Sequence, residues 1–213
     1  EVPIIEDDPY SQLRFEGEPQ PSLLALENAR QQQGEQRNQP YEGNVVMLNT
    51  FSKVLTPGLR VAWIVGPAQV IHKLVLAKQG ADLHTATLNQ MIAYELTRSG
   101  FLEEHVPLLR KLYHERCDAM LAALEEYFPD TVSWTHPQGG LFLWVTLPEG
   151  VDTAQLLKDA LEYRIAFVPG APFHANGGGS NTMRLSFSNV NSEQIEEGIR
   201  RLGKLLHTRM LRA

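Results

Sequence analysis

The spacing of apolar positions in the first part of the chain predicts three buried strands followed by two helices. The runs "VPIIEDD", "VVMLNT" and "RVAWIVG" are short, unbroken and rich in valine and isoleucine. Such runs are typical of strands covered on both faces of a sheet with parallel neighbours. The helices are expected over 67–78, beginning at Pro67, and over 85–100, ending at Gly100. The first helix groups Val70, Ile71, Leu74 and Val75 together. We therefore predict an α/β region over 1–100.

One long amphipathic pattern follows this region. Between Phe101 and Phe128, apolar side chains recur at helical spacing: Leu102, Val106, Leu109, Tyr113, Met120 and Leu124. The pattern predicts a connecting helix over 101–128. Cys117 falls on the same face, so we expect a core residue there rather than a nucleophile.

The remaining residues predict a small α+β domain over 129–213. Two strands flank a Pro-Gln-Gly-Gly turn and are followed by a helix, "DTAQLLKDALEYR". The strand "IAFVPG", a Gly-rich loop at 177–179 and the strand "MRLSFS" come next. The closing helix begins at the cap pair Asn191 and Gln194. Its inner face is expected to carry Ile195, Ile199, Leu202 and Leu206.

A glutamine-rich segment separates the first two strands. Residues 27–43 are polar and show no clear apolar period. We expect a surface loop or a frayed helix end there, without chemistry of its own.

Composition narrows the classes of function. The 213 residues are 43% hydrophobic and 21% charged, which is ordinary for a globular protein. A net charge of −6 offers no basic surface for nucleic acid, and no apolar run has the length of a membrane span. The single cysteine excludes an internal disulfide framework and favours a cytoplasmic location. No metal-ligand set is assigned. Because the sequence reaches strand character at its second residue, we expect it to be a fragment of a longer protein.

Two candidate residues follow the first strand. In "EDDPY", Asp7 and Tyr10 lie just past a strand end, where α/β folds place their ligands. A carboxylate and a phenol there can hold two edges of a heteroaromatic ring. Taken alone, however, the pair is better explained as an acidic cap and a half-buried tyrosine.

The stretch "NTFSKVLTPGLR", residues 49–60, carries a stronger signal. Lys53 follows the second strand, and a lysine amine attacks carbonyls when burial or nearby charge lowers its pKa. Arg60 offers a guanidinium fork for a phosphate, and Thr50 and Ser52 add hydroxyl donors. An isolated Ser-Lys pair would be a solvated turn. The combined order of strand, lysine, Pro-Gly turn, arginine and strand favours a binding site.

These motifs, together with "PQGGLFLW", "FVPGAPF" and "MRLSFS", resemble the C-terminal half of class I/II aminotransferases. That family consists of pyridoxal-phosphate enzymes with the aspartate aminotransferase fold. The resemblance is strongest to the 2-aminoadipate/aromatic type, which is shared with the effector domains of GntR-family regulators of the MocR kind. It runs in the right order over nearly the whole chain. The implied fold is α/β: part of the large-domain sheet plus a small α+β C-terminal domain.

The resemblance also implies roles at the cofactor, pyridoxal 5'-phosphate. Lys53 would form a Schiff base with the cofactor aldehyde and then act as the acid and base of the proton shift. Asp7 would pair with the pyridinium nitrogen, and Tyr10 would donate to the ring oxygen. Thr50, Ser52 and Arg60 would hold the phosphate.

Substrate contacts follow from the same resemblance. Arg184, in "MRLSFS", would bind the substrate α-carboxylate bidentately. Without the family, this arginine would be taken for a surface residue of a strand. The aromatic residues Trp134, Phe142 and Trp144 are more often core than pocket at such spacing.

The implied activity is ping-pong transamination between an amino acid and a 2-oxo acid, in a homodimer, without nucleic acid or membrane contact. Two alternatives stay open: a cofactor-binding sensor domain of a GntR/MocR-type regulator, and a lyase or decarboxylase on the same fold. The presence of Arg184 with Lys53 and Asp7 favours transamination. Because the resemblance lacks the family's N-terminal half, the chain is expected to hold only half of a site.

Overall fold

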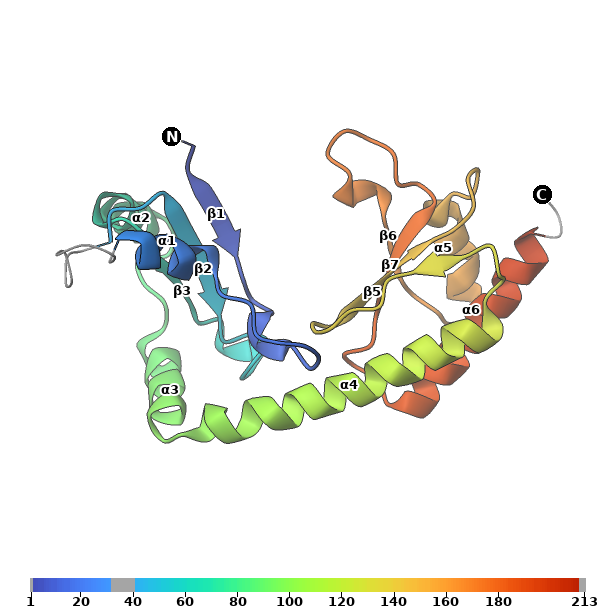
Figure 1. Ribbon diagram of the computed structural model, residues 1–213, viewed down its shortest axis with the longest axis horizontal. Coiled ribbons are helices and arrows are strands. Elements are labelled where there is room, and N and C mark those ends of the chain that lie inside the picture. The colour runs from blue at the N-terminus through green and yellow to red at the C-terminus, as the bar shows by residue number, and fades with distance from the viewer. Residues whose placement is uncertain (1, 32–40, 211–213) are drawn as a thin grey trace. The chain divides into compact units, whose positions relative to one another are not determined.

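Residues 2–31 and 41–210 are described by the computed structural model, and they form two separate sheets (Figure 1). The chain divides into a first unit, Glu1–Leu109, and a second unit, Arg110–Ala213. The boundary falls within the long helix α4 (Phe101–Tyr127). The division into 1–100, 101–128 and 129–213 stays a prediction. None of the described helices is both long and apolar enough to cross a membrane.

The sheet of the first unit is mixed. Strand β1 (Ile4–Asp7) pairs in parallel with β2 (Val45–Thr50), and β2 pairs antiparallel with β3 (Ala62–Val65). The expectation of strands covered on both faces was wrong, because Ile5 of β1 is 72% exposed. The parallel pair still places the carboxyl ends of β1 and β2 at the same edge of the sheet.

The helices of the first unit lie close to their expected positions. Helix α2 (Ala68–Ala81) and helix α3 (Thr87–Arg98) follow β3. The apolar group expected on α2 is not buried, since Leu74 and Val75 are both exposed. Helical periodicity identifies an apolar face, but it does not show that a neighbouring element covers that face.

The start of the glutamine-rich segment is the end of a helix, which is one of the two expected possibilities. Helix α1 (Leu23–Gln31) covers its first residues, and 32–40 lie outside the described residues. The Glu6 carboxylate of β1 accepts hydrogen bonds from the backbone N–H groups of Leu23 (2.7 Å) and Leu24 (3.0 Å). An anion at this end satisfies the free N–H groups of the first helical turn. Glu6 therefore fixes where α1 begins.

The middle of α1 is hydrogen-bonded to β2 through Glu27. The Glu27 carboxylate accepts hydrogen bonds from the Tyr41 hydroxyl and from the backbone N–H groups of Asn44 (3.0 Å) and Val45 (3.1 Å). The bond from Tyr41 and then the bond from Asn44 hold the pKa of Glu27 below its usual range. Burial, followed by the bond to Glu27, raises the pKa of Tyr41 to about 12. Glu27 thus joins α1 to the first residue of β2.

The second unit contains an antiparallel sheet in the order β4-β5-β7-β6. Its strands are β4 (Ser133–Trp134), β5 (Phe142–Thr146), β6 (Val168–Pro169) and β7 (Thr182–Ser186). Helices α5 (Thr153–Glu162) and α6 (Ser192–Met210) lie on the same side of the sheet in Figure 1. Side chains of β5 alternate between a buried face and a half-exposed face, and Met183 and Leu185 of β7 are buried with Arg184 half-exposed between them. The buried set is Leu143, Val145, Met183 and Leu185.

Several expectations for the second unit are confirmed. The Gln194 backbone N–H donates to Asn191 Oδ1 (2.9 Å), and the Asn191 backbone N–H donates to Gln194 Oε1 (3.3 Å). The two residues therefore cap α6 reciprocally. Cys117 of α4 is buried in the core. The expected inner face of α6 is also buried: Ile195, Ile199, Leu202 and Leu206.

A strained residue precedes β3. The short helix η2 (Pro57–Leu59) ends at Arg60, whose backbone is left-handed with φ 54° and ψ 36°. Hydrogen bonds hold both neighbours, because the Leu59 carbonyl accepts from the Asn89 side chain (3.0 Å) and the Val61 carbonyl accepts from the Thr50 hydroxyl (3.1 Å). A non-glycine residue in this conformation costs about 1 kcal/mol or more.

Replacing Arg60 with glycine is expected to relieve this strain. Arg60→Gly should have a free energy of unfolding about 1 kcal/mol higher than Arg60→Ala, because both lose the side chain but only glycine tolerates the left-handed backbone. Urea denaturation of the two variants measures the difference. Equal stabilities would mean that the left-handed conformation is not kept in solution.

Alkaline pH is expected to weaken the contact between α1 and β2. Between pH 10 and about 12 the unfolded chain loses the Tyr41 proton while the folded protein keeps it, so the stability from Tyr41 falls as pH rises through this range. The free energy of unfolding should therefore drop less between about pH 9 and about pH 11 in Tyr41→Phe than in the wild type. Tyr94→Phe, which changes a 63% exposed side chain, is the control. Identical drops in wild type and Tyr41→Phe would contradict the assignment.

Candidate active site

Tyr10 and Lys53, two of the residues expected in the site, lie close together beyond the carboxyl ends of β1 and β2. Asp7 is the last residue of β1 and aligns with Leu48 of β2, and the next N–H, of Asp8, donates to the Leu48 carbonyl (3.0 Å). Tyr10 follows three residues later and is half-buried. The Lys53 amine lies 5.6 Å from the centroid of the Tyr10 ring. An amine and a phenol from two neighbouring strand ends thus share one edge of the sheet.

Lys53 lies in a tight turn and not on the strand itself. Strand β2 ends at Thr50, and the Leu55 N–H donates to the Phe51 carbonyl (2.9 Å), which closes one helical turn around Lys53. Val54, beside it, is only 4% exposed and anchors the turn in the core. A buried neighbour and a closed turn restrict where the amine can point, while Lys53 stays half-buried.

The hydroxyl groups of Thr50 and Ser52 form a compact pair. Their oxygens are 2.9 Å apart, and the Ser52 backbone N–H donates to the Thr50 hydroxyl (3.1 Å). The Arg60 side chain is exposed and donates to the Pro57 carbonyl (3.2 Å). Within the described residues, no hydrogen bond joins Arg60 to either hydroxyl. Hydroxyls and a guanidinium are suitable donors for a phosphate oxygen.

Arg184 is a separate candidate and belongs to the second unit. It lies on the half-exposed face of β7, between Trp144 of β5 and Val168 of β6 in the register of the sheet. Its guanidinium carbon is 4.1 Å from the centroid of the Phe142 ring and 5.1 Å from that of Phe173. In the part of the chain that the structure describes, its guanidinium makes no hydrogen bond or ion pair. Its N–H groups are therefore available for an external carboxylate.

Sequence reasoning misses the role of the phenylalanines around Arg184. It takes Phe142 for a core residue and does not single out Phe173. The signal that could have found Phe142 is the alternation in "FLWVT", where Leu143 and Val145 mark the buried face. Phe142 and Trp144 must then share the opposite face with Arg184.

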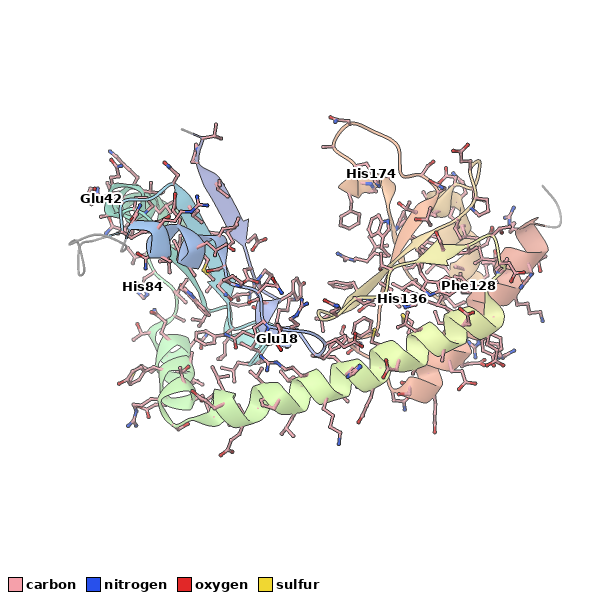
Figure 2. The ribbon with its side chains drawn as sticks, in the orientation of Figure 1. Glu18, Glu42, His84, Phe128, His136 and His174 are labelled. Atoms are coloured by element: carbon pink, nitrogen blue, oxygen red, sulfur yellow. The ribbon has the colours of Figure 1, made fainter. Side chains whose placement is uncertain are left out.

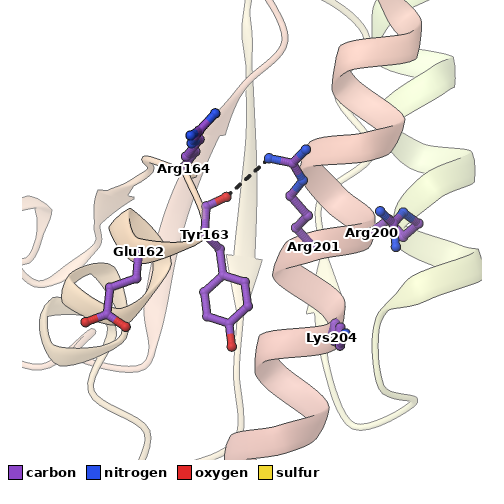
Figure 3. Close-up of a pocket in the computed structure, with 6 residues that line it drawn as sticks. All are labelled: Glu162, Tyr163, Arg164, Arg200, Arg201 and Lys204. Atoms are coloured by element: carbon purple, nitrogen blue, oxygen red, sulfur yellow. Dashed lines mark hydrogen bonds between the residues drawn. The ribbon is translucent and has the colours of Figure 1, made fainter.

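A hollow in the second unit holds a cluster of charged groups with a structural explanation (Figure 3). The Arg201 side chain donates to the carbonyl of Tyr163, the C-cap residue of α5 (3.4 Å), and to the Glu197 carboxylate (2.6 Å). Hydrogen bonds from Arg201 and then from Arg200 lower the pKa of Glu197. Cations at a helix C-terminus satisfy free carbonyls. The hollow, of about 360 Å³, is lined by Glu162, Tyr163, Arg164, Arg200, Arg201 and Lys204.

The chain is similar in sequence to known aminotransferases. The chain is 44% identical over 207 residues to aromatic-amino-acid aminotransferase 1 of Thermococcus litoralis, covering 97% of this chain and 46% of that protein. It is 48% identical over 203 residues to the 2-aminoadipate transaminase of Thermus thermophilus, covering 95% of this chain and 48% of that protein.

A solved structure has the same fold. The crystal structure of LysN, an α-aminoadipate aminotransferase from Thermus thermophilus complexed with N-(5'-phosphopyridoxyl)-L-leucine, matches with a TM-score of 0.90 and 45% identity. The match covers 99% of this chain and 51% of that one, so the chain spans about half the length of these relatives. The family model for aminotransferase class I and II matches residues 2–202. The chain therefore belongs to the class I and II aminotransferase family.

Proposed function

We propose that this chain is part of a pyridoxal-phosphate-dependent aminotransferase that moves an amino group from an amino acid to a 2-oxo acid. The observation that carries the proposal is the Lys53 amine placed over the Tyr10 ring, at the shared edge of β1 and β2. The names of the relatives support it, as does the phosphopyridoxyl amino acid in the LysN structure.

The groups present in the first unit fit this cofactor. Lys53 offers a primary amine for the aldehyde, the hydroxyls of Thr50 and Ser52 offer donors for the phosphate, and Arg60 adds a positive charge. Asp7 offers a carboxylate for the ring nitrogen. When bound, pyridoxal phosphate supplies an electron sink for negative charge at the α-carbon of an amino acid.

Each side chain then has a distinct task. The Lys53 amine would hold the cofactor aldehyde, and as a free amine it would hold or deliver a proton at Nζ. The Asp7 carboxylate keeps the ring nitrogen protonated by charge pairing. The Tyr10 hydroxyl donates to the ring oxygen. In the second unit, Arg184 binds the substrate α-carboxylate through two parallel N–H groups.

The alternatives of a regulator effector domain and of a lyase are less favoured, because the similar proteins described above are aminotransferases by name. We infer that the substrates belong to the aromatic or 2-aminoadipate class, by analogy with those relatives. A cytoplasmic location is supported by the single, buried cysteine, which needs no oxidising compartment. The negative net charge supports a protein that binds small molecules rather than nucleic acid.

A homodimer is the proposed assembly, and it predicts self-association. Large apolar side chains of the first unit are exposed, among them Ile5 (72%), Leu88 (68%) and Met91 (60%). Exposed apolar groups of this size favour contact with a second protein surface. Sedimentation over a range of concentrations should show dimers or larger species of this chain. A monomer at the highest concentration would contradict the prediction.

Reduction with borohydride tests the cofactor site. After incubation with pyridoxal phosphate, the protein should show a visible imine absorbance, and peptide mass spectrometry should place the reduced adduct on Lys53. Lys53→Arg should lose both signals. Lys78→Arg is the matched control, because Lys78 is exposed and pairs with Asp82 (2.8 Å). An adduct spread over surface lysines in every variant would refute the site.

Adding substrates separates an enzyme from a sensor. Amino transfer from an aromatic amino acid or 2-aminoadipate to a 2-oxo acid should require Lys53. Cofactor binding on Lys53 without amino transfer would favour the sensor alternative.

A further inference from the structure

An aromatic cluster surrounds Arg184 on the half-exposed face of the second sheet. The rings of Phe142 and Phe173 lie against its guanidinium, with centroids 4.1 and 5.1 Å from the guanidinium carbon. The Trp144 ring meets the Phe173 ring edge-on, with centroids 5.3 Å apart. The His174 ring, labelled in Figure 2, lies 6.3 Å from that of Trp144. We call Phe142 and Phe173 the aromatic clamp.

The exposure of Phe173 calls for an explanation other than core packing. Its side chain is 51% exposed, although the sheet offers a buried face on its other side. A phenylalanine that stays half in water contributes little to the core. Its ring packs against the Arg184 guanidinium and the edge of Trp144 instead.

The loop that carries Phe173 is fastened at both ends to one residue. Thr182 is buried, and its carbonyl accepts from the Gly170 N–H (2.7 Å), where the loop leaves β6. The Thr182 hydroxyl donates to the Gly179 carbonyl (2.8 Å), where the loop returns to β7. The short helix η3 (Ala171–Phe173) therefore starts from a fixed point.

The glycines at these two points are required by space. A Cβ on Gly170 would lie 1.8 Å from the Thr182 hydroxyl oxygen, and a Cβ on Gly179 would lie 2.1 Å from the His174 ring. Gly179 also has a left-handed φ of 67°. The His174 ring lies over Gly179 and beside Trp144, and the Trp144 ring contacts that of Phe173. The Gly-rich loop thus supports the aromatic clamp.

We propose that Phe142 and Phe173 are positioning residues that hold the Arg184 guanidinium ready for a carboxylate ligand. An aromatic ring attracts the flat face of a guanidinium, whereas the N–H groups of the guanidinium point outward from its edges. Contact with rings therefore orients Arg184 without using the donors that bind a carboxylate bidentately. This inference rests on the proposed function for the identity of the ligand, an amino acid or a 2-oxo acid. The positioning of Arg184 for a carboxylate does not depend on that identity.

The first experiment does not depend on the cofactor. The Arg184 side-chain N–H signals, assigned by their loss in Arg184→Lys, should show ring-current shifts in nuclear magnetic resonance spectra. These shifts should decrease in Phe142→Leu and Phe173→Leu. Titration with maleate, a simple dicarboxylate, should move the same signals, and each leucine variant should weaken its affinity roughly three- to tenfold. Phe173→Tyr should restore wild-type affinity.

The second experiment uses the cofactor-loaded protein. Phe142→Leu and Phe173→Leu should raise the KM for the amino acid with little change in kcat, while the adduct on Lys53 forms as in the wild type. Reaction with the matching amine that lacks a carboxylate should be unaffected. Phe101→Leu, which changes an exposed phenylalanine stacked on His105 (4.9 Å), is the control.

The outcomes separate the two proposals. Loss of maleate affinity in the leucine variants supports the clamp even if Lys53 forms no adduct, in which case only the proposed function fails. Unchanged maleate affinity in folded Phe142→Leu and Phe173→Leu, or equal effects on amino acid and amine, would overturn the clamp.

Discussion

The parallel pairing of β1 with β2 is the constraint on which the first unit depends. A parallel pair needs a connection that returns the chain to the same end of the sheet, and α1 supplies part of it. Two carboxylates hold that helix in place: Glu6 satisfies its first N–H groups, and Glu27, from its middle, reaches the start of β2. The pairing places the residues after both strands at one edge, and the contact between Lys53 and Tyr10 follows from it.

Local features of the chain could be predicted because local physics decides them. The cap pair of Asn191 and Gln194 and the inner face of α6 depend on neighbours within a few residues. The direction of β3 and the exposure of Leu74 could not be predicted this way, since both depend on which distant surface is present. The extent of helix α1 was not predicted because its second half lies in the polar segment 27–43, which has no apolar period, and because its contacts with Glu6 of β1 and, through Glu27, with Asn44 join residues far apart in the sequence.

The residues of the candidate site likewise differ in whether they could be predicted from the sequence. The order of strand, lysine and Pro-Gly-Leu-Arg is enough to indicate Lys53 and Arg60, whereas the left-handed backbone of Arg60 is visible only in three dimensions. Arg184 needs the family resemblance, because a single arginine in a strand has no local signature. Phe173 is beyond sequence reasoning, since its contact with Arg184 depends on how a loop of irregular backbone folds back onto the sheet.

The double attachment of the 170–179 segment to Thr182 has an evolutionary consequence. Hydrogen bonds with Thr182 fix both ends of this loop, so changes between those ends need not shift the register of β6 and β7. Residues of this segment other than Gly170, Phe173 and Gly179 can therefore change while the sheet stays intact. Selection for new preferences among substrate side chains can then act on those other residues, while Phe173 and the sheet keep Arg184 in place.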